Sequence, residues 1–166
     1  LRLLRVFKVV ADCGGMAAAE LELDLAMSTI SRHVKDLESR LGLTVCYDVR
    51  FPHLFRQLAK AGAAMIAVPA AFTVPTGEAH WETLLRARAI ETGAFILAPA
   101  QGGLHEDGRR TWGRLTVVGP WGEVIGKLDN DDPGVLFATL DLDAVDTARR
   151  AVPALTHDRD FAPPVR

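Results

Sequence analysis

The stretch that decides the fold runs Gly42-Leu43-Thr44-Val45-Cys46-Tyr47-Asp48-Val49-Arg50-Phe51-Pro52. Apolar and β-branched residues lead into Cys46, a polar turn follows, and Phe51-Pro52 opens a predicted helix. The strand would fix the thiol in place, and the amide groups at a nearby helix start favour the thiolate over the thiol. The pattern therefore predicts a reactive cysteine at the end of a strand. A small side chain buried at a strand end is the alternative interpretation of Cys46.

The composition of the whole chain excludes several classes of protein. The 166 residues are 49% hydrophobic and 24% charged, which is typical of a soluble globular protein with a buried core. A formal charge of −2 gives no overall electrostatic case for nucleic acid or membrane partners. No apolar run approaches the roughly 20 residues that a membrane helix needs, and the N-terminus lacks a signal-peptide pattern. With only Cys13 and Cys46, no disulfide framework is expected, so the sequence predicts a cytoplasmic location.

Residues 1–42 have the spacing of three short helices. Apolar residues recur at helical intervals in three segments, 1–11, 16–25 and 28–41. Gly14 and Gly15 should separate the first two helices. Ser28 should cap the start of the third helix and Gly42 should end it. This arrangement predicts a helix-turn-helix.

Two segments of this region are Ala17-Ala18-Ala19-Glu20-Leu21 and Ser28-Thr29-Ile30-Ser31-Arg32-His33-Val34-Lys35-Asp36-Leu37-Glu38-Ser39-Arg40-Leu41-Gly42. They resemble the DNA-binding head of the LysR-type transcription regulators. The resemblance implies that four side chains face DNA, namely Thr29, Ser31, Arg32 and Lys35. The local charge is balanced, with six Lys or Arg and six Asp or Glu in residues 1–42. An ordinary three-helix cap with a solvated charged face is therefore the alternative.

The period of the apolar residues changes after Pro52. Helices are predicted over 51–61, 78–92 and 141–150, and strands over 63–68, 94–98, 115–118, 124–128 and 135–140. Loops are predicted over 69–77 and 101–112, a hairpin turn at Pro120-Trp121-Gly122, and a tail without periodicity over 157–166. Strands that alternate with helices and then form a meander predict an α/β layered fold.

Five segments in this part follow one another in a specific order. They are Cys46-Tyr47-Asp48-Val49-Arg50-Phe51-Pro52, Val68-Pro69-Ala70-Ala71-Phe72-Thr73, Thr76-Gly77-Glu78-Ala79-His80-Trp81-Glu82, Arg86-Ala87-Arg88-Ala89-Ile90-Glu91 and Pro120-Trp121-Gly122. They resemble the C-terminal half of a nitrilase-superfamily carbon–nitrogen hydrolase, in the branch of the omega-amidases and deaminated-glutathione amidases. The resemblance implies part of an α-β-β-α sandwich that usually dimerises. The predicted domains are the helix-turn-helix at 1–42 and the hydrolase half at 43–156, with the tail at 157–166.

The resemblance also assigns roles to individual residues. Cys46 would be the nucleophile that attacks an amide or nitrile carbon, forming a thioester or thioimidate that water later hydrolyses. The backbone N–H of Tyr47 would donate to the oxyanion. Phe72, Thr73 and Thr76 would line the substrate pocket. The substrate would be a small amide or nitrile, and neither a cofactor nor a metal is expected.

Five further residues are predicted to be structural. His80 and Trp81 lie in a predicted helix start and are assigned to packing and capping. Arg88 and Glu91 have the spacing of an ion pair on one helix face. Cys13 has no base beside it in the sequence.

The remaining expectations concern what the hydrolase half lacks. The family's mechanism uses a glutamate base and a lysine from segments upstream of the cysteine, and neither has a matching position here, so impaired activity is predicted. The partial sandwich should expose an apolar sheet face that a second copy or a complementing chain covers. Two alternatives stay open: a LysR-type DNA-binding head on a foreign body, and a fusion or chimera without function. Gly42–Cys46 fits both resemblances and marks the joint.

Overall fold

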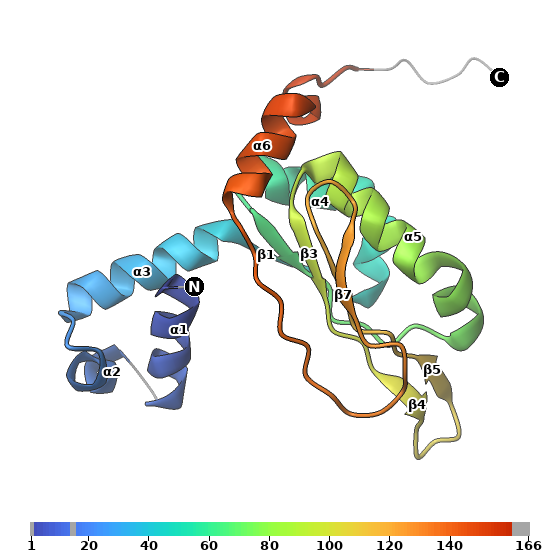
Figure 1. Cartoon of the computed structure of the whole chain (residues 1–166), viewed down its shortest axis with the longest axis horizontal. Coiled ribbons are helices and arrows are strands. Elements are labelled where there is room, and N and C mark those ends of the chain that lie inside the picture. The colour runs from blue at the N-terminus through green and yellow to red at the C-terminus, as the bar shows by residue number, and fades with distance from the viewer. Residues whose placement is uncertain (1, 14–15, 161–166) are drawn as a thin grey trace. The chain divides into compact units, whose positions relative to one another are not determined.

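The computed structural model describes residues 2–13 and 16–160, and the side chains of these residues except at positions 2–4, 7, 11 and 35–39 (Figure 1). Gly14 and Gly15, predicted to separate two helices, lie outside the described residues, as do residues 161–166 of the predicted tail. The chain divides into two compact units, Leu1–Leu41 and Gly42–Arg166. Each unit is described by itself.

The first unit holds three helices, α1 (Arg2–Asp12), α2 (Met16–Leu23) and α3 (Met27–Arg40). Its small core contains Val6, Ala19 and Ile30. The start of α3 differs from the prediction, because Glu20 rather than Ser28 caps it: the Met27 N–H donates to Glu20 Oε1 over 2.5 Å. The end of α3 also differs from the prediction: the helix ends at Arg40, two residues before Gly42, the predicted stop.

The second unit is built on a mixed sheet in the order β1-β2-β3-β6-β7. Its strands are β1 (Leu41–Leu43), β2 (Met65–Ala67), β3 (Phe95–Ala98), β6 (Thr116–Val118) and β7 (Val124–Lys127). The β2–β3 pair is parallel, and the β3–β6 and β6–β7 pairs are antiparallel. Gly42, predicted to end a helix, lies buried in β1, where an added Cβ would stand 3.2 Å from Ile66 and from Leu58. A larger side chain there would require Ile66 and Leu58 to shift by a few tenths of an ångström.

Two helices, α4 (Pro52–Lys60) and α5 (Val74–Thr92), pack against one face of this sheet (Figure 1). The core between them contains residues of both helices and of the central strands, including Phe55, Ile66, Trp81, Leu85, Ile96 and Val118. A third helix, α6 (Asp143–Ala151), is followed by a short 3-10 turn, Ala154–Thr156. The α/β layering predicted from the pattern is confirmed.

Helix α5 begins four residues earlier than the prediction, within the predicted loop 69–77. Thr73 has the extended backbone of a helix cap, and Pro75 occupies the first turn, where its missing N–H has no partner to lose. The sequence predicts a loop over residues 69–77. Residues 74–77 instead extend α5 toward the neighbouring hairpin.

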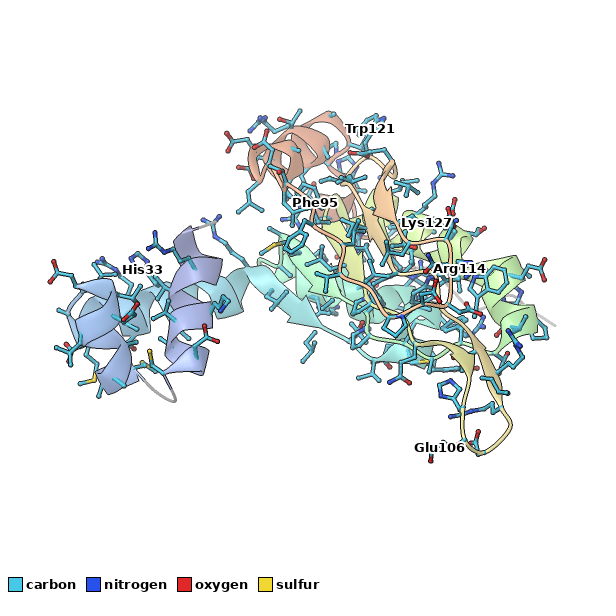
Figure 2. The ribbon with its side chains drawn as sticks, turned by 60° about the horizontal axis from the view of Figure 1, so that its bottom comes forward. His33, Phe95, Glu106, Arg114, Trp121 and Lys127 are labelled. Atoms are coloured by element: carbon cyan, nitrogen blue, oxygen red, sulfur yellow. The ribbon has the colours of Figure 1, made fainter. Side chains whose placement is uncertain are left out.

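The predicted loop 101–112 contains a separate hairpin, β4 (Gly102–Leu104) and β5 (Arg110–Trp112). Figure 2 shows this hairpin projecting from the second unit with Glu106 at its tip. Each strand is only three residues long and carries two glycines or polar residues, so no alternation marks it in the sequence.

The predicted strand 135–140 is wrong, because residues 129–142 of the described chain form no strand. Val135 and Phe137 are 75% and 91% exposed, and Leu136 packs against Gly126 of β7. Alternating apolar residues do not make a strand where no neighbouring strand pairs with them.

Candidate functional site

The backbone at Cys46 has an uncommon conformation. Cys46 follows β1 and opens a 3-10 turn, Cys46–Arg50, with a φ of +33°. Non-glycine residues rarely adopt positive φ, and such strain costs of order 1–3 kcal/mol, which surrounding contacts must offset. Here the Cys46 N–H donates to the Pro69 carbonyl over 2.8 Å, and the Thr44 N–H donates to the Ala67 carbonyl over 3.0 Å. The turn is therefore fixed to the end of β2.

Hydrogen bonds from within the turn and from α5 hold this conformation. The Val45 N–H donates to Asp48 Oδ2 over 2.8 Å, and the Asp48 N–H returns a bond of 2.7 Å to the Val45 carbonyl. Arg88, only 5% exposed, reaches from α5 and donates from Nε to the Val49 carbonyl over 2.8 Å. Arg88 also pairs with Glu91, which confirms the predicted ion pair.

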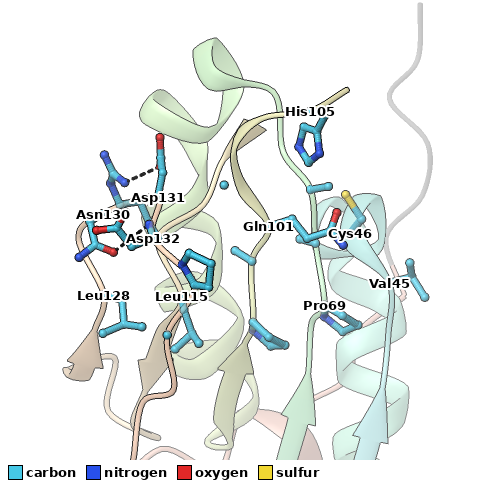
Figure 3. A pocket seen from close by; sticks show the side chains of 18 residues that line it. Val45, Cys46, Pro69, Gln101, His105, Leu115, Leu128, Asn130, Asp131 and Asp132 are labelled. Carbon is cyan, nitrogen blue, oxygen red and sulfur yellow. Dashed lines mark hydrogen bonds and ion pairs between the residues drawn. The ribbon is translucent and has the colours of Figure 1, made fainter. Parts of the chain in front are cut away.

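A cavity of about 860 Å³ lies beside this turn, and Cys46 lines it (Figure 3). One wall comes from the ends of β1, β2 and β3, through Val45, Pro69, Ala70, Pro99, Ala100 and Gln101. The opposite wall is the segment after β7, which we call the strap and define as residues 128–134. The cavity is also lined by Ala71, Gly102, His105, Arg114 and Leu115. Cys46, predicted to lie directly at a strand end, instead follows three residues after β1 ends, and it lines a hollow large enough for a small molecule.

Ion pairs hold the strap in place. Asp131 Oδ1 lies 2.9 Å from Arg114 Nη1, and Asp131 Oδ2 lies 3.5 Å from Arg110 Nη2. Lys127 Nζ, just before the strap, lies 2.9 Å from Asp129 Oδ1 and 3.0 Å from Glu82 Oε2. Hydrogen bonds to Asp129 and Glu82 raise the pKa of Lys127 above its ordinary 10.5.

Both the backbone and the side chain of Arg114 are held by contacts. Its backbone has a φ of +66°, and its carbonyl accepts a hydrogen bond of 3.0 Å from the indole N–H of Trp81. Its guanidinium lies 4.8 Å from the ring centroid of Trp112. Trp81 is buried, in line with the packing role predicted for it. Sequence reasoning missed Arg114, Asp131 and His105, because none of them lies in a recognised segment.

The other predicted pocket residues lie elsewhere in the second unit. Phe72 is buried and packs on Trp81, with ring centroids 4.9 Å apart. Thr73 and Thr76 lie at the start of α5, with their hydroxyl oxygens 2.8 Å apart. Among the described residues that line the cavity, these three do not appear, so their substrate contact stays a prediction.

The Tyr47 side chain is exposed. Within the part of the chain that the structure describes, the Tyr47 N–H donates no hydrogen bond. Arg50 lies over the Tyr47 and Phe72 rings, 5.4 and 5.3 Å from their centroids. Both terminal nitrogens of the Arg50 guanidinium lie 3.4 Å from His80 Nδ1. Arg50 therefore connects the turn Cys46–Arg50 to two aromatic rings and to a histidine of α5.

The predicted DNA-contacting residues all belong to α3. Thr29 and Ser31 are half-buried and Arg32 is exposed, whereas the Lys35 side chain lies outside the described part of the structure. Their role stays a prediction. Cys13 packs against the core of the first unit, as expected for a structural cysteine.

The described residues contain neither a cluster of metal-ligating side chains nor a helix that could span a membrane. Within residues 2–13 and 16–160, no group of three or more His, Cys, Asp or Glu side chains could hold a metal ion. In the same ranges, every helix is too short or too polar to cross a membrane.

Comparison with known proteins identifies the family. Residues 17–150 match the family described as carbon-nitrogen hydrolase, a range that includes α3 of the region resembling LysR-type heads. The chain is 52% identical over 120 residues to the deaminated glutathione amidase of Yersinia enterocolitica, covering 72% of this chain and 42% of the relative. The chain therefore spans less than half the length of this curated relative.

Two solved structures resemble this chain. The NitFhit protein of C. elegans is 48% identical, with a TM-score of 0.67 over 72% of this chain and 29% of that one. A mutant of the Nesterenkonia amidase, with the acetamide moiety of fluoroacetamide added covalently at its active-site cysteine, is 37% identical, with a TM-score of 0.55 over 67% of this chain and 41% of that one. With its mixed sheet and packed helices, the chain has an α/β nitrilase-type fold and belongs to the carbon-nitrogen hydrolase family.

Proposed function

We propose that this chain carries the thiol nucleophile of an amidase-type carbon–nitrogen hydrolase, and that Cys46 is that nucleophile. The observation that carries the proposal is the strained backbone of Cys46, with φ +33°, at the edge of a cavity of about 860 Å³. Strained backbone conformations cluster at functional sites, where surrounding contacts hold them. The covalent acetamide at the active-site cysteine of the Nesterenkonia amidase gives independent support for thiol chemistry in the family.

In the proposed reaction, Cys46 Sγ attacks the carbonyl carbon of a small amide. A C–S bond forms, the C–N bond breaks with a proton passing to the leaving amine, and water then hydrolyses the thioester. The free N–H of Tyr47 is the proposed donor to the oxyanion, because it has no competing acceptor among the described residues. A nitrile would pass through a thioimidate instead.

The proposed reaction also requires proton transfers. The resemblance assigns them to a glutamate base and a lysine upstream of the cysteine, and neither has a matching position in this sequence. We propose that turnover by this chain alone is impaired and that a second copy or a complementing chain covers the exposed sheet. Exposed Leu43 and Val45, beside the cavity end of β1, support such a partner. The first substrate to try is deaminated glutathione, since a relative with 52% identity is named for it.

The test is alkylation of the full chain with iodoacetamide, followed by mass mapping of the two cysteines. We expect Cys46 to react faster in the folded chain than in denaturant and Cys13 to react more slowly. Ammonia release from small amides is then compared between the parent chain and Cys46→Ser, with Cys13→Ser as the matched control. Slower reaction of Cys46 in the folded chain, or measurable amide turnover that Cys46→Ser leaves unchanged, would overturn the proposal.

A second candidate is DNA binding by a domain at residues 1–42, beside a hydrolase part at 43–156. The supporting observation is that Leu1–Leu41 forms its own compact unit, with Arg32 exposed on α3. Gel shifts over a range of salt concentrations measure DNA binding. The Arg32→Ala, Lys35→Ala variant should then bind DNA more weakly than the parent chain. Unchanged binding in that variant would exclude the predicted DNA-binding face of α3 and leave residues 1–42 without a DNA-binding role.

A further inference from the structure

His105 lines the same cavity as Cys46 but belongs to no recognised segment of the sequence (Figure 3). It follows β4 and is half-buried. Its backbone is fixed at both ends of the hairpin turn, because its N–H donates to the Arg109 carbonyl and its carbonyl accepts from the Gly108 N–H, each over 2.9 Å. The imidazole is therefore carried on a rigid turn.

A buried threonine holds the ring. His105 Nε2 lies 2.7 Å from Thr111 Oγ1, across the hairpin on β5. Thr111 is 1% exposed, and its Oγ1 also lies 2.8 Å from the Gln101 carbonyl oxygen. Three groups thus form one chain of hydrogen bonds, from the imidazole through the hydroxyl to the carbonyl.

The chemistry of these groups fixes the tautomer. A carbonyl oxygen only accepts, so the single hydroxyl hydrogen of Thr111 is donated to Gln101. Thr111 Oγ1 can then only accept from the imidazole, and His105 Nε2 must carry a hydrogen. A neutral imidazole has one N–H, so Nδ1 of His105 is an unprotonated acceptor.

We propose that His105 is a specificity residue whose Nδ1 accepts a hydrogen bond from the amide N–H of a substrate held beside Cys46. The inference rests on the proposed function, because it takes the cavity as the amide site. It adds a preference for amides that keep an N–H over amides whose nitrogen is fully substituted. Arg114, which also lines the cavity, has its guanidinium paired with Asp131, so it does not compete for the imidazole.

The first experiment reads the ring directly and needs no reaction. In full-length Cys46→Ser protein with ¹⁵N-labelled histidine, NMR of the neutral ring should show the proton of His105 on Nε2. Acetamide should shift the Nδ1 resonance, whereas N,N-dimethylacetamide, which has no N–H, should leave it in place. A proton on Nδ1, or equal shifts with both amides, would overturn the proposal.

Matched variants of Thr111 separate this network from folding. Thr111→Ser keeps the hydroxyl and should keep the tautomer and the acetamide response. Thr111→Val keeps the shape but removes the acceptor, so the ring should populate both tautomers and the response should weaken. An unchanged tautomer in Thr111→Val would show that the hydroxyl does not set it.

The second experiment measures selectivity at the thiol. Alkylation of Cys46 by iodoacetamide and by N,N-dimethyl-iodoacetamide is compared, each rate divided by that of a free thiol. One lost hydrogen bond predicts a preference for iodoacetamide of about three- to tenfold, absent in His105→Leu and partly restored in His105→Gln, whose side-chain oxygen can accept. A His105→Leu variant that keeps the preference would contradict the role of His105. Failure of Cys46 to react would instead count against the proposed nucleophile, and the NMR result would still decide the role of His105.

Discussion

The turn Cys46–Arg50 and the strap, residues 128–134, border the same cavity but are held by different means. The turn is fixed by backbone hydrogen bonds and by the buried side chain of Arg88. The strap is held by Asp131, whose partners Arg110 and Arg114 are partly solvated. Buried hydrogen bonds are costly to break, whereas solvated ion pairs contribute little and respond to salt. The difference indicates that the wall carrying Cys46 is rigid and that the wall formed by the strap is more easily displaced.

The largest effect expected from this comparison is that of Arg88→Ala. The variant removes a charged donor and leaves the Val49 carbonyl without its partner, so the free energy of unfolding should fall by about 2–3 kcal/mol. Urea unfolding measures the loss, and the alkylation rate of Cys46 should change with it. Glu91→Ala is the matched control, because it removes only the half-exposed partner and should cost less than about 1 kcal/mol. Equal losses in the two variants would contradict the role of the Val49 bond.

A smaller effect is expected on the opposite wall. Asp131→Asn removes the charge that both arginines share and should cost about 0.5–1 kcal/mol at low salt and less at high salt. Alkylation of Cys46 should become faster as the strap loosens. Asp132→Asn, which alters a neighbouring carboxylate of the strap, is the control. A salt-independent loss in Asp131→Asn would mean that the wall is not held by its ion pairs.

The smallest effect concerns the anchor before the strap. The pKa of Lys127 is raised by its carboxylate partners, so its contribution to stability is present below pH 10.5 and is lost as the pH rises through the raised value. The difference in urea midpoint between the parent chain and Lys127→Met should therefore shrink in alkaline solution above pH 10.5. A difference that stays constant across that range would assign the effect of the substitution to packing.

The sequence predicts those parts of the site that depend on neighbours in the chain. The position of Cys46 follows from a strand, a polar turn and a helix-opening proline within eleven consecutive residues. Helix α4 and strands β2, β3, β6 and β7 lie within the predicted ranges for the same reason, because apolar runs bounded by Gly or Pro mark them.

Features that depend on contacts across the fold were not predicted. The hairpin β4–β5 has short strands without alternation, and the role of His105 depends on Thr111 and on a carbonyl at Gln101. Phe72, predicted to line the pocket, is buried and packs against Trp81, and its contact with substrate stays a prediction. The neighbouring helix decides whether a loop side chain faces the core, and the local sequence does not specify it.

The positive φ of Cys46 has a consequence for how stability and activity are shared at one residue. Glycine adopts this conformation without strain, whereas cysteine, serine and alanine do not. Cys46→Gly should therefore unfold at higher urea concentration than Cys46→Ala, although both lack the thiol. At the position of the proposed nucleophile, selection for the thiol opposes selection for a relaxed backbone, and the difference in urea midpoint between the two variants measures the cost of that strain.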